Sequence, residues 1–427
     1  MKGLTIILAI CSSWVLSAGA GLADWPDFRG PTQDGHVAEG QELPLKWGEK
    51  ENVKWKTAIH GEGWASPVVM DGKVWVATAR ADGLTLSAMC LDQKTGEILL
   101  DRVLVTDDNP EPTSNRINNF AASSPVVEKG RVYFHFGSSG TICLDANTYE
   151  ELWRRVDFPC SHWRGAGSSP ALWRDKIYLT FDGADQQYLV ALDKKTGKTL
   201  WRKDRSTQYN DLDAKGRPSS FGDARKAYGT PVFIEVGGKT QMISAGAKAC
   251  WAYNPETGEE LWSVSYPQHS GSSMPVYSKD LGILYINTGL GKPQIMAMKM
   301  DDKARGDISE THLLWKLIKR VSKQSSPVLV GGELYMAADN VAACIDAKTG
   351  EVLWSERLKG KVTASLIYGA GRVYFYDETG GTTVVKAARS FELLAHNQLE
   401  EGSLASPAAA GGAIFLRSKG FLYRIGD

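Results

Sequence analysis

Side chains that commonly perform chemistry are scattered through this 427-residue sequence. The histidines are His36, His60, His135, His162, His269, His312 and His396. They lack the close spacing of zinc sites, and no nucleophile-elbow motif supports a Ser-His-Asp triad. The acidic pair Asp301 and Asp302 lies in the polar stretch KMDDKARGDISE, which predicts a solvated loop. These residues therefore predict no catalytic group and no metal site.

The cysteines predict small buried side chains and no disulfide framework. Five of them follow the N-terminal segment, an odd number for a protein in an oxidising compartment. Cys90, Cys143 and Cys344 each stand directly before Leu-Asp or Ile-Asp, which predicts equivalent buried strand positions. Cys160, in the loop sequence CSHWRGAG, is the candidate for an exposed or reactive thiol.

The first 23 residues have the pattern of a signal peptide. Lys2 precedes an apolar run from Leu4 to about Leu16, and small residues continue to Ala23. The run is too short to span a bilayer, and Cys11 lies inside it instead of after it, where a lipid anchor would need it. Lys plus Arg and Asp plus Glu both number 49, so charge gives no reason to expect a nucleic acid partner. The sequence predicts a soluble, exported monomer with residues 24–427 as one domain.

A ten-residue string recurs along this domain. Its copies are LDQKTGEILL from Leu91, LDANTYEELW from Leu144, LDKKTGKTLW from Leu192, YNPETGEELW from Tyr253 and IDAKTGEVLW from Ile345. Elements resembling S-S-P start at Ala65, Ser123, Ser168, Gly229, Ser273, Ser325, Ala364 and Ala405. Eight starts at spacings of roughly 40 to 60 residues are typical of propeller blades.

Each repeat predicts four short antiparallel strands. Pro opens the first strand, D-x-x-T-G turns the chain between the third and fourth strands, and the fourth strand carries a Trp. The last repeat lacks the Trp strand, and NVKWKTAI at residues 52–59 has the pattern to replace it. We therefore expect an all-β, eight-bladed β-propeller whose ring is closed by an N-terminal strand. Seven blades is the alternative, because VVKAARSFELLA from Val384 is degenerate.

The repeated strings also predict residues that dock neighbouring blades. Bulky tryptophans suit such contacts, and the Asp and Gly positions shape the turns they would meet. The predicted docking residues are Asp92, Asp145, Trp153, Asp193, Gly197, Trp201, Gly258, Trp262, Asp346, Gly350 and Trp354.

The repeats resemble those of the pyrroloquinoline-quinone (PQQ) enzyme-like β-propeller family. The leader DWPDFRGPTQDG from Asp24 also resembles that of exported PQQ-like repeat proteins. This resemblance implies the fold, and it implies two contrasting functions: quinoprotein alcohol dehydrogenases, and BamB-like outer-membrane assembly proteins without enzymatic activity. Quinoprotein dehydrogenases of the family carry vicinal cysteines and a Ca²⁺-binding Glu, Asn and Asp set. Neither can be matched to this sequence, so no cofactor is expected and PQQ with Ca²⁺ is the alternative.

Residues just before the S-S-P elements should gather at the mouth of the central channel. They are Trp64, Asn118, Asn119, Phe120, His162, Trp163, Arg164, Arg225, Tyr228, His269, Lys323, Gln324 and Lys361. This aromatic and basic set predicts a small anionic ligand or an acidic peptide, and a solvated rim that binds nothing is the alternative. Polar insertions from Thr106 and Arg205 would shape the same surface.

The favoured interpretation is an exported, non-catalytic binding or scaffold protein, with a role in cell-envelope protein assembly. A periplasmic PQQ-dependent oxidoreductase and a propeller that binds carbohydrate or a small ligand are the alternatives.

Overall fold

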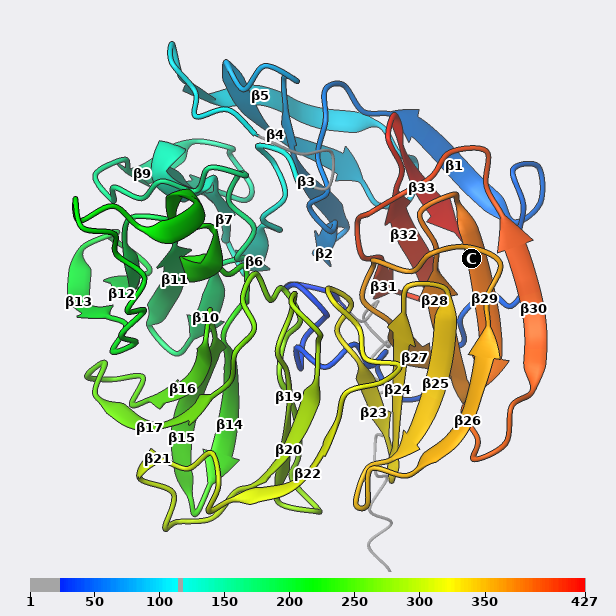
Figure 1. Cartoon of the computed structure of the whole chain (residues 1–427). Coiled ribbons are helices and arrows are strands. Elements are labelled where there is room, and N and C mark those ends of the chain that lie inside the picture. Colours follow the sequence, from blue (N-terminus) through cyan, green and yellow to red (C-terminus); the bar gives the residue numbers. More distant parts are fainter. Residues whose placement is uncertain (1–23, 114–117, 427) are drawn as a thin grey trace, which may run out of the picture.

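Eight four-stranded antiparallel sheets stand around a central axis like the blades of a propeller (Figure 1). The computed structural model describes residues 24–113 and 118–426, so the expected signal peptide lies outside the described residues. The eight-bladed expectation is confirmed and the seven-bladed alternative is wrong, because the degenerate seventh repeat forms a complete sheet.

The blades follow one another in chain order, each running from an inner to an outer strand. Blades 1 to 4 are β2 (Val68–Met70), β3 (Lys73–Ala79), β4 (Thr85–Asp92) and β5 (Ile98–Thr106); β6 (Val126–Glu128), β7 (Arg131–His135), β8 (Thr141–Asp145) and β9 (Glu151–Arg155); β10 (Ala171–Trp173), β11 (Lys176–Asp182), β12 (Gln187–Asp193) and β13 (Thr199–Asp204); and β14 (Val232–Val236), β15 (Lys239–Ala245), β16 (Ala249–Tyr253) and β17 (Glu260–Ser265). Blades 5 to 8 are β18 (Val276–Ser278), β19 (Ile283–Asn287), β20 (Ile295–Lys299) and β22 (Leu313–Leu317); β23 (Val328–Val330), β24 (Glu333–Ala338), β25 (Val341–Asp346) and β26 (Val352–Arg357); β27 (Ile367–Gly369), β28 (Arg372–Tyr376), β29 (Gly381–Lys386) and β30 (Leu393–Gln398); and β31 (Ala408–Ala410), β32 (Ala413–Arg417), β33 (Phe421–Ile425) and β1 (Val53–Ala58). The short strand β21 (Gly306–Asp307) pairs in parallel with β17, and 3-10 turns form η1 (Gly137–Ser139) and η2 (Ser219–Arg225).

The N-terminal strand β1 closes the ring. It pairs antiparallel with β33, with Trp55 opposite Arg424 and Ala58 opposite Phe421. The first and last described strands thus share one sheet, which leaves no incomplete blade where the ring begins and ends.

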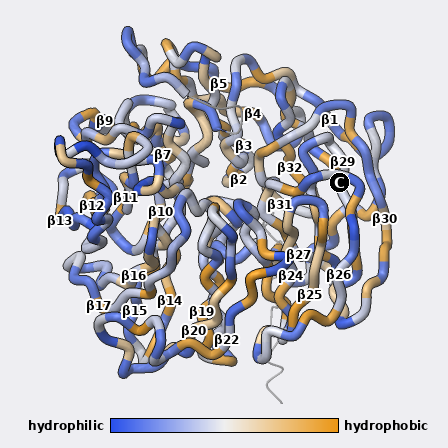
Figure 2. The backbone as a smooth tube through the Cα atoms, viewed as in Figure 1, coloured by the Kyte–Doolittle hydropathy of each residue, from blue (hydrophilic) through white to orange (hydrophobic). Residues whose placement is uncertain are grey.

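Buried apolar residues of neighbouring blades form shared clusters, so each sheet is buried between its neighbours. Figure 2 shows hydrophobic residues distributed along the strands. Cys90, Cys143, Cys250 and Cys344 are buried on the strands. Cys160 is buried as well, and desolvation raises the pKa of its thiol, so the expected exposed thiol is wrong. The loop before blade 3 turns inward, and Cys160 packs with Phe158 and Phe181.

The turns between third and fourth strands follow the D-x-x-T-G chemistry. Asp193 Oδ1 accepts hydrogen bonds from the backbone of Lys195 at 3.1 Å and of Thr196 at 2.8 Å. Gly197 closes the turn at φ +71°. A side chain there would collide with Trp153 of the preceding blade, because an added Cβ would lie 2.8 Å from its ring.

The same Trp-on-Gly contact recurs around the ring. Trp201 covers Gly258, Trp55 covers Gly96 and Trp315 covers Gly350. The indole N–H of each tryptophan also donates to a backbone carbonyl in that turn, as Trp153 does to Lys194 at 3.0 Å. A motif copy thus serves two junctions, since its Gly receives the Trp of the preceding blade and its own Trp reaches the following one.

Trp262 and Trp354 lie in different surroundings. Trp262 donates to Gln241 Oε1 of its own blade at 2.8 Å, because the following blade carries the insertion with β21 in place of a D-x-x-T-G turn. Trp354 meets Phe391 with ring centroids 5.2 Å apart, because the seventh repeat has no turn glycine. Trp315 was not among the predicted docking residues, because its repeat lacks the D-x-x-T-G string that marks the others.

The leader, residues 24–51, enters the central channel, a placement that repeat periodicity does not predict (Figure 1). Trp25 and Val69 exchange two backbone hydrogen bonds of 2.8 Å on blade 1, and Pro26 accepts from Val127 of blade 2. Further along the leader, Val37 donates to Tyr368 of blade 7. The leader therefore connects inner strands of blades 1, 2 and 7 before the chain reaches β1.

Candidate functional site

A central pocket of about 300 Å³ lies on the propeller axis, and all eight blades contribute to it. It is lined by Phe28, Trp64, Ser66, Asn118, Ala122, Ser124, Arg164, Gly167, Ser169, Asp223, Tyr228, Thr230, Ser270, Ser272, Leu290, Gln324, Thr363, Ser365, Leu404 and Ser406. Phe28 comes from the leader, so this segment forms part of the pocket wall. The volume and the mixture of apolar and polar groups suit a small ligand or one terminal group of a larger one.

In six of the eight S-S-P elements the second residue lines the pocket, and hydrogen bonds to hydroxyls link neighbouring elements. The backbone N–H of Ser66 donates to Ser124 Oγ at 2.9 Å, that of Ser124 to Ser169 Oγ at 3.0 Å, and that of Ser169 to Thr230 Oγ1 at 2.9 Å. The pattern resumes beyond Met274, with Ser326 donating to Ser365 and Ser365 to Ser406. We call the six members that line the pocket the hydroxyl ring: Ser66, Ser124, Ser169, Thr230, Ser365 and Ser406.

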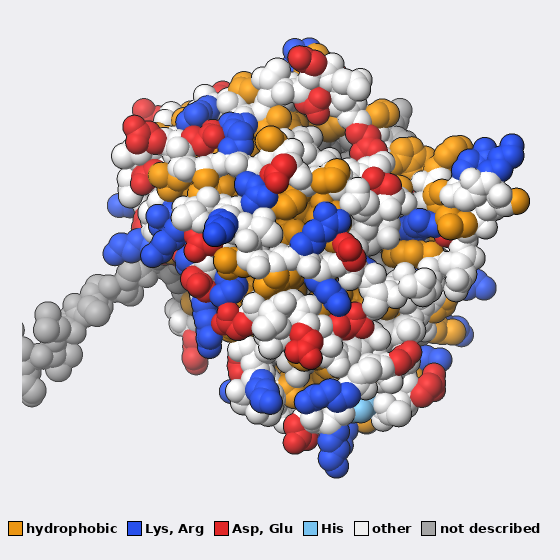
Figure 3. All heavy atoms as spheres, turned by 90° about the vertical axis from the view of Figure 1, so that its left-hand side faces the viewer, with side chains coloured by type: hydrophobic (Ala, Val, Ile, Leu, Met, Phe, Trp, Pro, Cys, Tyr) orange, Lys and Arg blue, Asp and Glu red, His pale blue; other side chains and the backbone are white. Residues whose placement is uncertain are grey.

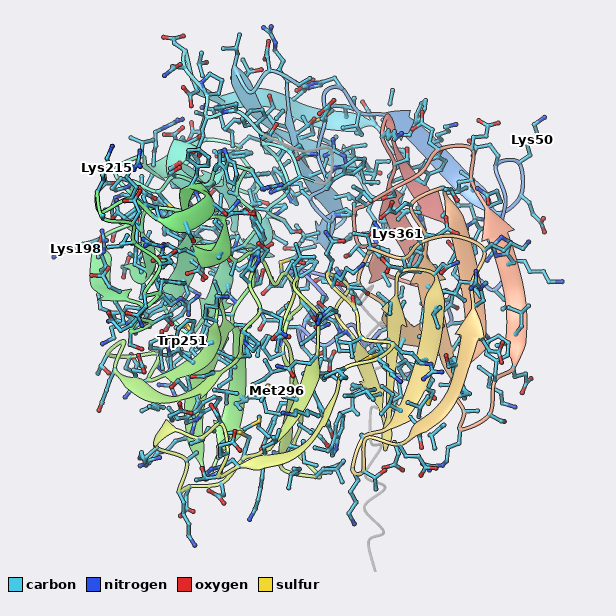
Figure 4. All side chains as sticks on the ribbon, viewed as in Figure 1. Lys50, Lys198, Lys215, Trp251, Met296 and Lys361 are labelled. Carbon is cyan, nitrogen blue, oxygen red and sulfur yellow. The ribbon has the colours of Figure 1, made fainter. Side chains whose placement is uncertain are left out.

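The structure brings only part of the predicted mouth set to the pocket. Trp64, Asn118, Arg164, Tyr228 and Gln324 line it. The residues outside the lining are Asn119, Phe120, His162, Trp163, Arg225, His269, Lys323 and Lys361. Figure 4 shows Lys361 near the centre of the ring, whereas Lys198 and Lys215 lie at its outer perimeter.

Acidic partners accompany the predicted basic residues. Lys323 pairs with Asp339 at 2.9 Å and Lys361 with Glu378 at 2.8 Å. Arg225 pairs with Asp211. The positive charge expected at the channel mouth is thus largely offset. The carboxylates that offset it lie outside the segments before S-S-P, from which that charge was predicted. Figure 3 likewise shows both signs of charge interspersed on one side of the ring.

One cationic cluster remains beside the pocket. Asp223, on η2, lies 2.6 Å from Lys226 Nζ and 3.3 Å from Arg164 Nε. Trp163 packs against both cations, with Lys226 Nζ 4.4 Å and Arg164 Cζ 4.8 Å from the ring. Desolvation lowers the pKa of Lys226, whose side chain is fully buried. Two cations share one carboxylate, so the cluster retains a net positive charge when Lys226 is protonated.

His162 is a buried packing residue. Its Nε2 accepts from the backbone N–H of Ser138 at 3.2 Å, and its backbone N–H donates to Glu111 at 2.7 Å. Desolvation lowers the pKa of His162 to about 4, so the ring is neutral near pH 7. His162 is therefore buried and does not line the pocket.

Asp27 makes the leader sensitive to pH. Its buried carboxyl accepts from Phe28 N at 2.6 Å and Gln33 Nε2 at 2.7 Å, and desolvation raises its pKa to about 7. The folded state therefore holds a proton that the unfolded chain, with a pKa of about 3.9, has lost above pH 5. We predict that this group lowers the free energy of unfolding by about 2 to 3 kcal/mol between pH 5 and pH 8.

Asp27→Asn should remove that part of the pH dependence, because an amide resembles the protonated carboxyl. Urea unfolding at pH 5 and pH 8 measures it, and identical pH dependence in both proteins would contradict the assignment.

The pocket does not match the donor set that PQQ with Ca²⁺ requires. Ca²⁺ takes six to eight oxygen ligands, including carboxylates. Asp223 is the one carboxylate in the described lining, and Lys226 and Arg164 already hold it. Within residues 24–113 and 118–426, no three His, Cys, Asp or Glu side chains cluster in a way that could hold a metal. The residues present therefore do not fit the metal-bound cofactor.

Fold and repeats together define the protein as a β-propeller of PQQ-type repeats. A family model described as "Outer membrane protein assembly factor BamB" matches residues 89–208, 139–292 and 250–423. The chain belongs to this family, and the overlapping matches reflect its repeated motif.

Individual relatives include both classes that the resemblance implies. The chain is 26% identical over 204 residues to quinohemoprotein alcohol dehydrogenase ADH IIB of Pseudomonas putida, covering 40% of this chain and 28% of that protein. It is 23% identical over 291 residues to BamB of Yersinia pestis, covering 56% of this chain and 70% of that protein. The chain spans only 22% to 28% of the length of four quinoprotein or quinone-dependent relatives.

Solved structures share the fold at low identity. A europium-containing methanol dehydrogenase superposes with a TM-score of 0.69 at 12% identity, covering 93% of this chain and 90% of that one. BamB from Moraxella catarrhalis gives 0.58 at 13% identity, covering 87% and 99%. Within the described part of the chain, no helix has the length and apolar character needed to cross a membrane.

Proposed function

We propose that the protein is an exported, non-catalytic binding or scaffold propeller that holds a protein or peptide partner over the central pocket, in cell-envelope protein assembly. The observation that carries this proposal is the pocket itself. It is accessible, it is lined by aromatic, hydroxyl and amide groups, and its single carboxylate is already paired. Such a lining can bind a ligand, but its described residues provide no free carboxylate to act as a base.

An exposed aromatic beside the pocket supports a macromolecular partner. Phe221 is 82% exposed, lies two residues from Asp223 and packs on Trp163 with ring centroids 6.2 Å apart. Both residues have positive φ, at 55°, a conformation that non-glycine residues rarely adopt. Exposed aromatics at restrained positions are typical interface anchors.

The quinoprotein oxidoreductase is the second candidate, because four relatives at 26% to 31% identity are quinoprotein or quinone-dependent dehydrogenases. The pocket weighs against it, because Asp223 is the one carboxylate in the described lining and is already paired.

A displayed random peptide library selected on the purified protein tests the proposal. We expect the recovered peptides to lose at least about tenfold in affinity for Phe221→Ala, since a central aromatic contact contributes more than 1 kcal/mol. Val103→Ala serves as control, because Val103 is 51% exposed on the outer strand β5. Equal affinity for both variants would contradict a partner surface at Phe221.

A further inference from the structure

The hydroxyl ring presents unused hydrogen-bond donors to the pocket. Ser124, Ser169, Thr230, Ser365 and Ser406 each accept a hydrogen bond from the backbone N–H of the preceding blade. That bond occupies a lone pair of the hydroxyl oxygen and leaves its O–H proton available. The pairing is built into the S-S-P repeat, so the same orientation recurs from blade to blade.

No acceptor within residues 24–113 and 118–426 takes up these protons. None of the six ring hydroxyls donates a hydrogen bond to a described protein group. All six residues are at least nine-tenths buried, from Ser66 and Ser124 at 2% exposure to Ser406 at 9%. Buried donors require an acceptor, and here only the contents of the pocket can supply one.

The charge around the pocket favours an acceptor that is negative. On one side, Arg164 and Lys226 share the single carboxylate of Asp223. In the leader, the buried guanidinium of Arg29 donates to Pro327 O at 2.7 Å. Pro327 directly follows Ser326, whose backbone N–H donates to Ser365 of the hydroxyl ring. Nε and Nη1 of Arg29 have no hydrogen-bond partner among the described residues.

We infer that the central pocket binds an oxyanion carried on a small apolar body, with the oxyanion on the hydroxyl ring. A carboxylate matches best, because it offers several acceptor sites, carries one charge and has no proton to donate. Phe28, Trp64, Tyr228 and Leu290 supply the apolar contacts for the body. This inference rests on the proposed binding function of the pocket, and it defines which chemical group enters.

Calorimetric titration with three probes of similar shape tests the inference. Benzoate should bind at least about tenfold more tightly than methyl benzoate, which lacks the charge, or benzylamine, which reverses it. Equal binding of benzoate and methyl benzoate, or no binding of benzoate, would overturn the inference. N-acetylphenylalanine, whose carboxylate resembles a peptide C-terminus, should likewise bind more tightly than its primary amide, and tighter binding of the amide would overturn the inference.

Serine variants locate the bound group. Ser169→Ala and Ser365→Ala should each weaken benzoate binding by about tenfold, the value of one hydrogen bond to a charged group. Ser168→Ala is the matched control: it also loses an inter-blade hydrogen bond, to Gly229 O at 3.0 Å, but Ser168 does not line the pocket. Equal benzoate affinity in all three variants would overturn the role of the ring.

The outcomes also separate this inference from the proposed function. If peptides bind at Phe221 but benzoate does not bind, the proposed partner surface would be supported and the oxyanion site would be contradicted. If benzoate binds and the protein also shows quinone-dependent turnover, the proposed non-catalytic function would be contradicted and the oxyanion site would be supported.

Discussion

Replacing Trp354 by alanine should lower the free energy of unfolding by about 3 to 5 kcal/mol. The indole is 8% exposed, lies between Tyr335 and Phe391 with ring centroids 6.0 Å and 5.2 Å away, and donates to Ala388 O at 3.0 Å. Truncation removes this packing and leaves the carbonyl of the neighbouring blade without its donor. Equilibrium denaturation in urea measures the change from the midpoint and slope.

Leu393→Ala is the control for that measurement. Leu393 lies on β30 of the next blade and is 55% exposed, so its truncation should change stability by less than about 0.5 kcal/mol. Trp354→Ala should leave benzoate affinity unchanged, because Trp354 does not line the pocket. A loss below about 1 kcal/mol would contradict the blade-docking role that the repeats predict.

The second large effect concerns the leader. Trp25→Ala should also cost about 3 to 5 kcal/mol, because Trp25 is 1% exposed and its backbone is paired with Val69 at the channel wall. Loosening the leader should displace Phe28 from the pocket and therefore weaken benzoate binding, unlike Trp354→Ala.

Glu39→Ala is the matched control within the leader, since Glu39 is exposed. Urea unfolding and benzoate titration of both variants test the assignment. If Trp25→Ala unfolds no more easily than Glu39→Ala, the leader is not an integral part of the channel.

The repeats made the fold predictable because a blade is a local structure. Asp193, Thr196 and Gly197 form a turn through contacts only a few residues apart, and the same signals recur in other repeats. The closing strand was predictable from Trp55, which completes the motif missing from the last repeat. The insertion before Trp315 removed that signal, so its contact with Gly350 was not foreseen.

The site was less predictable because long-range contacts create it. Trp64, Arg164 and Tyr228 were found from topology, since inter-blade loops must pass the channel mouth. The leader has no repeat pattern that would reveal its contact with Tyr368. S-S-P was interpreted only as the start of a strand, and the recurrence of Ser or Thr beside Pro was the available signal for the hydroxyl ring.

The most direct measurement of the central claim is a titration of purified protein with PQQ and Ca²⁺, followed by visible absorbance, thermal shift and dye-linked alcohol oxidation. We predict no stoichiometric PQQ binding and no turnover, because Asp223 is paired with Lys226 and Arg164 and no other carboxylate lies in the described lining. Tight one-to-one binding of PQQ with alcohol oxidation would contradict the account and assign the protein to the quinoprotein oxidoreductases.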